Sequence, residues 1–203
     1  MIDALLKDVI DPMWERLARP LARAGFTPNQ VTAMGLVLIL AVSAAYLWHR
    51  NPLVYALMLA VAFAFDALDG AVARQTGLSS KAGGYFDAMV DRYQELIVLG
   101  AIGWVTGLWA LALVAFAGGV ITSYAKARTA LEIPTSNTAW PDFFERLERI
   151  IFLCVLLLLA GLIDAGWLMT AGLAIYAALC HLTALQRMRR AVRLLREADQ
   201  DRR

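Results

Sequence analysis

The sequence predicts an all-α integral membrane protein with six transmembrane helices preceded by an amphipathic interfacial helix. Of the 203 residues, 60% are hydrophobic and 18% are charged, and the mean hydropathy is +0.59. A typical soluble domain is nearer half apolar and a quarter charged. Several apolar stretches approach the about 20 residues that a helix needs to cross a bilayer. These observations argue against a soluble enzyme, a disordered chain or a disulfide scaffold, and the length fits one domain over residues 1–203.

The interfacial helix is predicted over residues 1–26. Apolar residues recur at helical spacing from Ile2 to Leu17, and charged residues such as Lys7 and Glu15 occupy the opposite face. A helix with one apolar face and one charged face lies in the plane of the membrane interface. We therefore expect this segment to rest on the membrane and not to cross it.

Six apolar segments within residues 27–186 are expected to cross the membrane as one bundle. They cover residues 31–48, 53–66, 84–106, 108–124, 150–165 and 167–185. Proline lacks the amide proton that a helix interior needs, and the prolines lie outside all six segments. Those at the helix starts and connections are Pro28, Pro52, Pro134 and Pro141.

The basic residues are sorted to one side of these spans. They gather before the first span, between the second and third, between the fourth and fifth, and in the basic tail of residues 187–203, whereas only Arg50 lies on the opposite side. Lys and Arg concentrate in cytoplasmic segments of membrane proteins. We therefore expect a multi-pass protein of the inner (cell) membrane with both termini, and the acidic segment described next, on the cytoplasmic side.

Four aspartates interrupt this apolar chain at helical spacing. Asp66 and Asp69 are three positions apart, and Asp87 and Asp91 are four apart, so each pair shares a helix face. The pairs lie at the inner end of the second span and the inner part of the third, joined by a turn that contains Gly77 and Gly83. An antiparallel hairpin would bring all four carboxylates into one cluster.

Such a cluster of carboxylates needs cations beside it. Four anions packed at a membrane boundary repel one another and lose hydration, so they are costly alone. Mg²⁺ and Mn²⁺ prefer carboxylate oxygen ligands. Two divalent ions about 3.5–4 Å apart are the arrangement that clamps a phosphoryl group during in-line displacement. We interpret the aspartates as ligands of two divalent ions.

Small residues and one arginine flank the aspartates. Gly70 and Ala73 leave a bare helix surface on which a base or a pyrophosphate can approach the backbone, and Gly83 permits the same at the third span. Arg74 offers a fork-shaped donor for phosphate. This combination indicates a nucleotide-sized slot beside the metals.

These residues carry a resemblance to the CDP-alcohol phosphotransferase (CDP-alcohol phosphatidyltransferase) family of membrane enzymes. The matching motif is Asp66-x₂-Asp69-Gly70-x₂-Ala73-Arg74-x₈-Gly83-x₃-Asp87-x₃-Asp91. The six spans, the surface helix and the cytoplasmic termini resemble that family too, so the likeness covers nearly the whole chain. It implies a homodimer in which an acceptor hydroxyl displaces CMP from a CDP-linked lipid such as CDP-diacylglycerol, with Mg²⁺ or Mn²⁺ bound.

The resemblance also implies residue roles. The residues that would bind the metals are Asp66, Asp69, Asp87 and Asp91, and Asp91 would also act as the catalytic base. The residues that would contact the CDP moiety are Pro28, Asn29, Thr32, Asp69, Gly70, Ala73, Arg74 and Gly83. The expected partners are therefore the CDP-lipid, a small phosphorylated alcohol and the surrounding membrane lipid, with no nucleic acid.

A second basic set bears on the acceptor. Arg146 and Arg149 are three positions apart on one helix face, Arg187 and Arg190 repeat that spacing, and Lys126 ends the fourth span. If they converge, they form a pocket for a phosphate on the acceptor. The stretches around residues 123–128 and 145–149 resemble the phosphatidylinositol-phosphate synthase branch, which implies inositol phosphate as the acceptor.

Other interpretations stay open at this point. Glycerol 3-phosphate also offers a hydroxyl and a phosphate, as in a phosphatidylglycerophosphate synthase. The arginines could serve only topology, or bind anionic lipid. A small cation or proton transporter could use an acidic cluster as its ion site, although its carboxylates would then lie near the bilayer midplane beside broken helices.

Overall fold

The structure is a bundle of helices, in a computed structural model that describes residues 2–133, 143–163 and 165–201. Within those ranges the chain is helical and contains no strand. The helices are α1 (Ile2–Arg23), α2 (Pro28–His49), α3 (Pro52–Asp66), α4 (Leu68–Thr76), α5 (Lys81–Thr106), α6 (Trp109–Ala130), α7 (Arg146–Leu162) and α8 (Leu168–Asp201). The all-α prediction is confirmed for this part of the chain.

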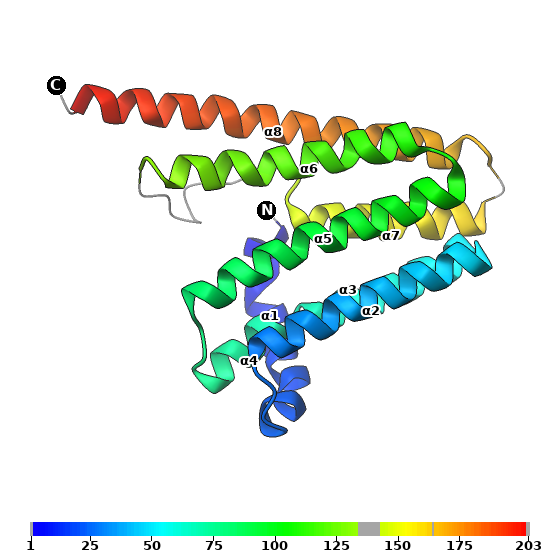
Figure 1. The fold of residues 1–203 in the computed structure, drawn as a ribbon, viewed down its shortest axis with the longest axis horizontal. Helices are drawn as coiled ribbons and strands as arrows, with labels where there is room; N and C mark the ends of the chain where they lie inside the picture. Colours follow the sequence, from blue (N-terminus) through cyan, green and yellow to red (C-terminus); the bar gives the residue numbers. More distant parts are fainter. Residues whose placement is uncertain (1, 134–142, 164, 202–203) are drawn as a thin grey trace.

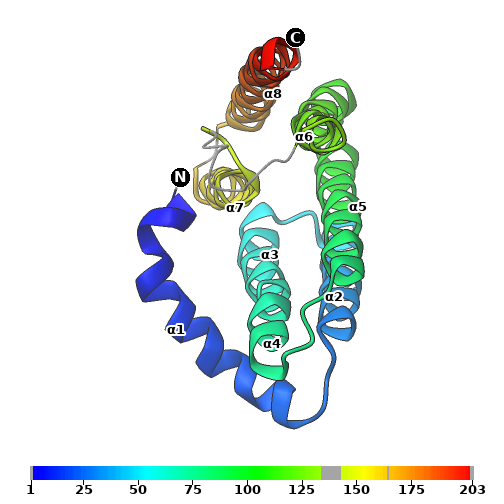
Figure 2. The ribbon, with the colours of Figure 1, turned by 90° about the vertical axis from the view of Figure 1, so that its left-hand side faces the viewer.

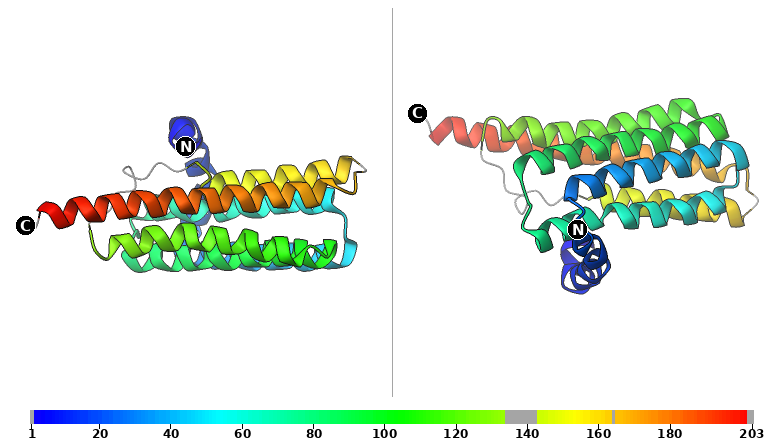
Figure 3. Two further views of the ribbon diagram at one scale, coloured as in Figure 1. Left: turned by 90° about the horizontal axis from the view of Figure 1, so that it is seen from above. Right: turned by 60° about the horizontal axis from the view of Figure 1, so that its bottom comes forward.

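The long helices, among them α2, α5, α6 and α8, run lengthwise through the molecule, and α1 crosses their end (Figure 1). The end view shows α1 outside the bundle beside α4 (Figure 2). Two further views show α1 projecting from one face while α8 extends past the other long helices (Figure 3). Residues 2–23 are thus helical and separate from the lengthwise bundle, which is the arrangement expected of an interfacial helix.

Four stretches of the described chain are long and apolar enough to cross a membrane. They are residues 28–49, 52–76, 109–130 and 168–200. The helix α7 has 17 residues, and α5 carries the charged residues Asp87, Asp91, Arg92 and Glu95. Each expected span coincides with one long helix, but four spans are what length and composition establish.

The hairpin between the second and third spans differs from the expectation. The helix α3 ends at Asp66, and a separate helix α4 begins at Leu68 after Ala67. The turn itself comes after Gly77, whose φ of +67° suits glycine. Gly83 lies inside the first turn of α5, where its amide donates to the Ser80 hydroxyl at 3.0 Å. Asp66 and Asp69 therefore stand on either side of a helix break.

Two apolar cores hold these helices. The larger core fills the lengthwise bundle and includes Tyr46 and Tyr55, whose rings stack with centroids 4.1 Å apart. The smaller core joins α1 to α4 through Ala18, Leu68 and Val72. Burial of apolar surface stabilises both contacts. Because α4 carries Asp69, the second core connects the interfacial helix to the acidic segment.

Candidate active site

A cavity of about 230 Å³ lies between the start of α2, α4 and the start of α5. It gathers all the residues predicted to contact CDP except Arg74. The lining residues are Pro28, Asn29, Thr32, Asp69, Gly70, Ala73, Leu78, Ser79, Ser80, Gly83, Gly84 and Asp87. Residues that are far apart in the sequence thus meet around one space.

Two helix N-termini border this cavity. The helix α2 starts with a capping box, in which the Thr27 hydroxyl accepts from the Gln30 amide and the Gln30 side chain accepts from the Thr27 amide. The helix α5 starts at the Ser80 cap. Helix N-termini carry partial positive charge and bind anions such as phosphate. The cavity therefore suits an anionic ligand.

Gly83 allows the close approach of α5 to α2. A Cβ atom at this position would lie 3.2 Å from the Asn29 side-chain oxygen and 3.1 Å from the Ser80 hydroxyl. Both contacts are tighter than side chains normally make. Gly83 is therefore also needed for the packing of α5 against α2, which its place in the sequence alone did not indicate.

Asp69 and Asp87 face the cavity from opposite helices. The Thr32 hydroxyl donates to Asp69 Oδ2 at 2.6 Å, and the Gly70 amide donates to Asp69 Oδ1 at 2.5 Å. Asp87 lines the same space from α5 and interacts electrostatically with Asp66 and Arg146. The cavity and the remaining two aspartates are therefore neighbours.

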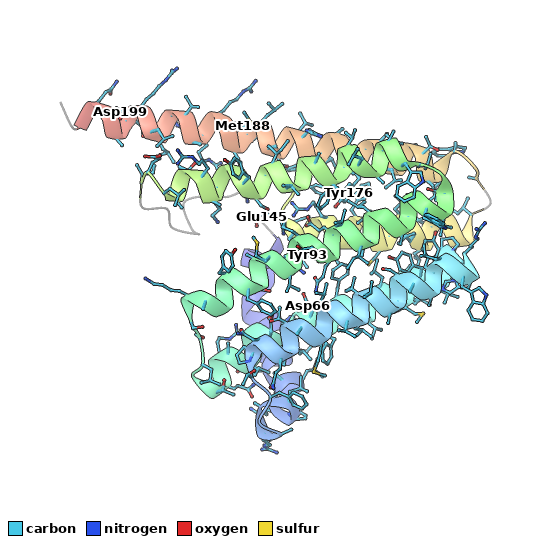
Figure 4. The ribbon with its side chains drawn as sticks, in the orientation of Figure 1. Asp66, Tyr93, Glu145, Tyr176, Met188 and Asp199 are labelled. Carbon is cyan, nitrogen blue, oxygen red and sulfur yellow. The ribbon has the colours of Figure 1, made fainter. Side chains whose placement is uncertain are left out.

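Asp66 and Asp91 are joined by Arg146. One nitrogen of Arg146, Nη2, lies 2.9 Å from Asp66 Oδ2 and 2.7 Å from Asp91 Oδ1. Gln94 donates to Asp66 Oδ1 at 2.8 Å and accepts from the same Arg146 nitrogen at 2.5 Å. Asp66, labelled in Figure 4, is only 3% exposed. Its charge is compensated from α5 and α7 at once.

The environment of Arg146 keeps its guanidinium charged. Arg146 precedes the span expected from residue 150, and its burial alone would lower its pKa. The carboxylates of Asp91 and Asp66 outweigh that effect and raise the pKa above the usual value of arginine. The arginine is thus a permanent cation inside the acidic cluster.

Gly35 of α2 makes room for Asp66. A Cβ atom at this position would lie 2.4 Å from Asp66 Oδ1 and 3.2 Å from Asp66 Cγ. Side chains essentially never approach that closely. The carboxylate therefore occupies space that any larger residue at position 35 would take.

The four aspartates form two adjoining pairs, and their chemistry fits divalent metals. Among the described residues, no three metal-ligating side chains already surround one position, and Arg146 contacts both Asp66 and Asp91. The donors are nevertheless all carboxylate oxygens from α3, α4 and α5, the type that Mg²⁺ and Mn²⁺ prefer. Asp91 Oδ1 is also buried without a hydrogen bond. That oxygen lies 2.7 Å from Arg146 Nη2, so it is paired by charge but accepts no hydrogen bond.

The predicted basic residues separate into different roles. Arg146 enters the acidic cluster, whereas Arg149 is 3% exposed and bonds Glu95 Oε1 through Nη2 at 2.6 Å and Nε at 3.2 Å. Arg187 donates to the Thr122 carbonyl at 2.8 Å and lies 3.7 Å from Glu145. Lys126 and Arg190 are half-buried. The structure thus brings Arg187 to the start of α7, whose first residue is Arg146.

Arg74 lies outside the cavity. Its side chain is half exposed, and its Nε is 4.0 Å from Glu15 of α1. Gln75, the next residue, donates to the Glu15 carbonyl at 2.5 Å. These contacts place the outer face of α4 against the interfacial helix.

Sequence reasoning missed three polar residues of α5. Arg92 lies 3.7 Å from Asp91 and 3.6 Å from Glu95 and also bonds the Ser123 hydroxyl. Gln94 and Glu95 are buried. Polar residues within a predicted membrane span are expensive and signal function or pairing. That rule, applied beyond Asp91, would have found them.

Comparison with known proteins decides the family. A family model described as CDP-alcohol phosphatidyltransferase matches residues 26–183. The chain belongs to the CDP-alcohol phosphatidyltransferase family. It is therefore a transferase of substituted phosphate groups in phospholipid biosynthesis, as the motif predicted, and the transporter interpretation is set aside.

Similar proteins of this family share most of the chain. An archaetidylinositol phosphate synthase of Pyrococcus horikoshii is 34% identical over 197 residues, which are 96% of this chain and 98% of that protein. A phosphatidylinositol phosphate synthase of Mycobacteroides abscessus is 31% identical over 196 residues, 93% of this chain and 87% of that protein. Both relatives cover the CDP-alcohol phosphatidyltransferase domain almost completely.

Solved structures share the fold. A crystal structure of Mycobacterium tuberculosis phosphatidylinositol phosphate synthase with manganese and citrate has a TM-score of 0.78 and 25% identity, covering 88% of each chain. The same enzyme with CDP-DAG bound has a TM-score of 0.78 and 24% identity, covering 89% of this chain and 94% of that one. The helical arrangement described above is therefore that of a known transferase.

Proposed function

We propose that this CDP-alcohol phosphatidyltransferase transfers a phosphatidyl group from CDP-diacylglycerol to a hydroxyl of inositol phosphate and releases CMP. The observation that carries the proposal is that the expected nucleotide-binding cavity and the acidic cluster lie side by side. A cavity built from the CDP motif adjoins a cluster in which Arg146 reaches Asp66 and Asp91. A donor nucleotide and a phosphorylated acceptor can therefore meet at the carboxylates. The names of the relatives support inositol phosphate over glycerol 3-phosphate as the acceptor.

The donor half of the reaction uses the cavity. The helix N-termini of α2 and α5 favour the charged pyrophosphate. Thr32 holds Asp69 in place, and Gly70, Ala73 and Gly83 leave the backbone open to the nucleotide. Arg74 is proposed to reach the CDP moiety from the rim of this cavity, next to Glu15.

The carboxylates are proposed to hold two divalent ions. The ligands would be Asp66, Asp69, Asp87 and Asp91. When bound, Mg²⁺ or Mn²⁺ supplies charge stabilisation for the pyrophosphate and for the departing CMP. Asp91 accepts the proton of the acceptor hydroxyl, and the freed oxygen attacks the lipid-linked phosphorus in line. Manganese in the Mycobacterium tuberculosis structure supports this choice of metals.

The acceptor half uses the basic residues near the start of α7. Arg146, Arg187, Lys126 and Arg190 are proposed to bind the acceptor phosphate. Arg149 is proposed to contribute by position, because its buried pairing with Glu95 anchors α7 to α5 one turn away from Arg146. The sugar or polyol would then lie between these residues and Asp91.

The membrane arrangement is proposed from the charge distribution. Six spans formed by α2, α3, α5, α6, α7 and α8 would place the site and both termini on the cytoplasmic side of the inner membrane. The diacylglycerol tails then stay in the bilayer while the acceptor and CMP exchange with water. The single domain would consist of an interfacial helix (residues 1–26), the bundle (residues 27–186) and a basic tail (residues 187–203). Two chains would form a homodimer.

An acceptor panel with labelled CDP-diacylglycerol tests this function. We expect CMP release with Mn²⁺ or Mg²⁺ to be fastest with inositol phosphate, slower with glycerol 3-phosphate, and absent in EDTA. Free inositol serves as the control, because it offers hydroxyls without the phosphate that Arg146 and Arg187 would bind. Faster turnover with glycerol 3-phosphate would overturn the acceptor assignment, and turnover in EDTA would overturn the metal assignment.

A further inference from the structure

Arg146 contacts two of the carboxylates that are proposed to hold the metal ions. A single nitrogen of its guanidinium lies within 3 Å of oxygens from Asp66, Asp91 and Gln94. These oxygens come from α3 and α5, whereas the arginine comes from α7. The nitrogen thus has three oxygen neighbours from two other helices, as a bound cation has.

The fit of Arg146 in this position is incomplete. Its Nε is buried without a hydrogen-bond partner, and so is Asp91 Oδ1, although that oxygen lies 2.7 Å from Arg146 Nη2. Arg149, one turn further along α7, bonds Glu95 through two nitrogens. Buried polar atoms without partners are costly. Arg146 therefore donates hydrogen bonds to Asp66 and Gln94 through Nη2, whereas its Nε and the Asp91 oxygen beside it have none.

A guanidinium and a divalent cation would compete for the oxygens of these carboxylates. Both would have to sit within about 3 Å of the same oxygens, where two cations repel strongly in a partly buried site. The side chain of Arg146 is 28% exposed, so it has a path toward the solvent-facing side. Its long, flexible side chain can leave without moving α7.

We propose that Arg146 is the internal counter-ion of the metal site: it neutralises Asp66 and Asp91 in the metal-free protein and leaves them when a divalent cation binds. This inference rests on the metal assignment in the proposed function. The released guanidinium is then available to the acceptor phosphate. Metal binding and acceptor binding are coupled in that order, because the arginine cannot serve both at once.

Metal binding to the full-length protein in detergent tests the inference without turnover. The affinity for Mn²⁺ is measured by titration calorimetry in wild type, Arg146→Gln and Arg146→Lys, without CDP-lipid or acceptor. A neighbouring arginine lowers the proton affinity of a carboxylate by about 10- to 1,000-fold. We therefore expect Arg146→Gln to bind Mn²⁺ at least about tenfold more tightly, and Arg146→Lys to stay near wild type.

The matched control removes a positive charge elsewhere. Arg128→Gln breaks an exposed pair with Glu132 on α6 and gives the same change in net charge. Its Mn²⁺ affinity should equal that of wild type. Equal or weaker binding by Arg146→Gln would overturn the counter-ion role and leave the arginine as an acceptor ligand only. Absence of Mn²⁺ binding in wild type would overturn the metal assignment as well.

Thermal unfolding gives a second readout in case the variant is unstable. Without its counter-ion, Arg146→Gln should unfold at a lower temperature than wild type in EDTA, because Asp66 and Asp91 then repel. Saturating Mn²⁺ should restore most of that difference, since the metal supplies the missing charge. A deficit of the same size with and without Mn²⁺ would contradict the proposal.

Discussion

Substitution of Gly35 by alanine tests how closely α2 must approach the acidic cluster. The added Cβ would lie 2.4 Å from Asp66 Oδ1, so either α2 moves away from α3 or the carboxylate rotates. Rotation breaks the bond from Gln94 at 2.8 Å and the pair with Arg146 at 2.9 Å. Separation of the helices opens the core between them. Either accommodation therefore disturbs Asp66 or the packing of α2 beside it.

The expected magnitude follows from these contacts. Forcing an extra methyl group into a packed site costs about 1–3 kcal/mol, and alanine returns up to about 1 kcal/mol through its better helix propensity. The net loss of about 0–3 kcal/mol lowers Tm by at most about 12 °C for a protein of this size. A displacement of about 1 Å in a catalytic group lowers turnover about 100-fold. We therefore expect Gly35→Ala to lose most of its turnover while the protein remains folded.

The assay measures CMP release, Mn²⁺ affinity and Tm for Gly35→Ala beside Gly100→Ala. Gly100 is the matched control, because it is also a helix glycine but an added Cβ there meets no atom within 4 Å. Gly100→Ala should keep wild-type turnover and metal binding. Wild-type turnover in Gly35→Ala would refute the conclusion that the position of Asp66 depends on this contact.

Three further predictions concern single side chains. Glu95→Ala leaves Arg149 buried without its partner, which costs about 3–5 kcal/mol and lowers Tm by roughly 6–20 °C. As a control, Glu132→Ala in an exposed pair should shift Tm by less than about 2 °C. Equal Tm shifts in the two variants would contradict the conclusion that burial makes the Glu95 pair important. Asp91→Asn should abolish CMP release while CDP-lipid binding, measured by equilibrium dialysis, persists; retained turnover would exclude Asp91 as the base. Thr32→Val removes the 2.6 Å hydrogen bond to Asp69. Because a hydrogen bond to a charged group contributes about 1.5–3 kcal/mol, the change should weaken CDP-lipid binding about 10- to 100-fold. An unchanged KM for the lipid would show that Asp69 does not need this hydrogen bond.

Local spacing predicted much of this site. The helices of the expected spans start within a few residues of the expected positions because prolines, glycines and charges mark those points, whereas α8 continues to Asp201, well past the expected end at residue 185. The motif residues of the first three spans meet around one cavity because hairpins join their helices. Residues close in sequence and periodic in spacing have few ways to arrange themselves, so a pattern suffices to place them.

Long-range contacts could not be predicted in the same way. Arg146 is 80 positions from Asp66, and no local pattern tells whether it faces an acceptor or enters the acidic cluster. The break at Ala67 was also missed, because alanine is the best helix former and gives no signal of a break. The burial of Arg149 follows from Glu95 on another helix. Each of these features depends on how whole helices pack.

The attachment of α4 to α1 links the amphipathic segment to the position of one of the four aspartates. The small core around Ala18 and Val72 packs α4 against α1, the helix that the sequence predicts to lie in the membrane interface. Asp69 lies on α4, whereas Asp66 belongs to the bundle on the other side of the break. The alignment of the two carboxylates therefore depends on how α1 is held against α4 as well as on the packing inside the bundle.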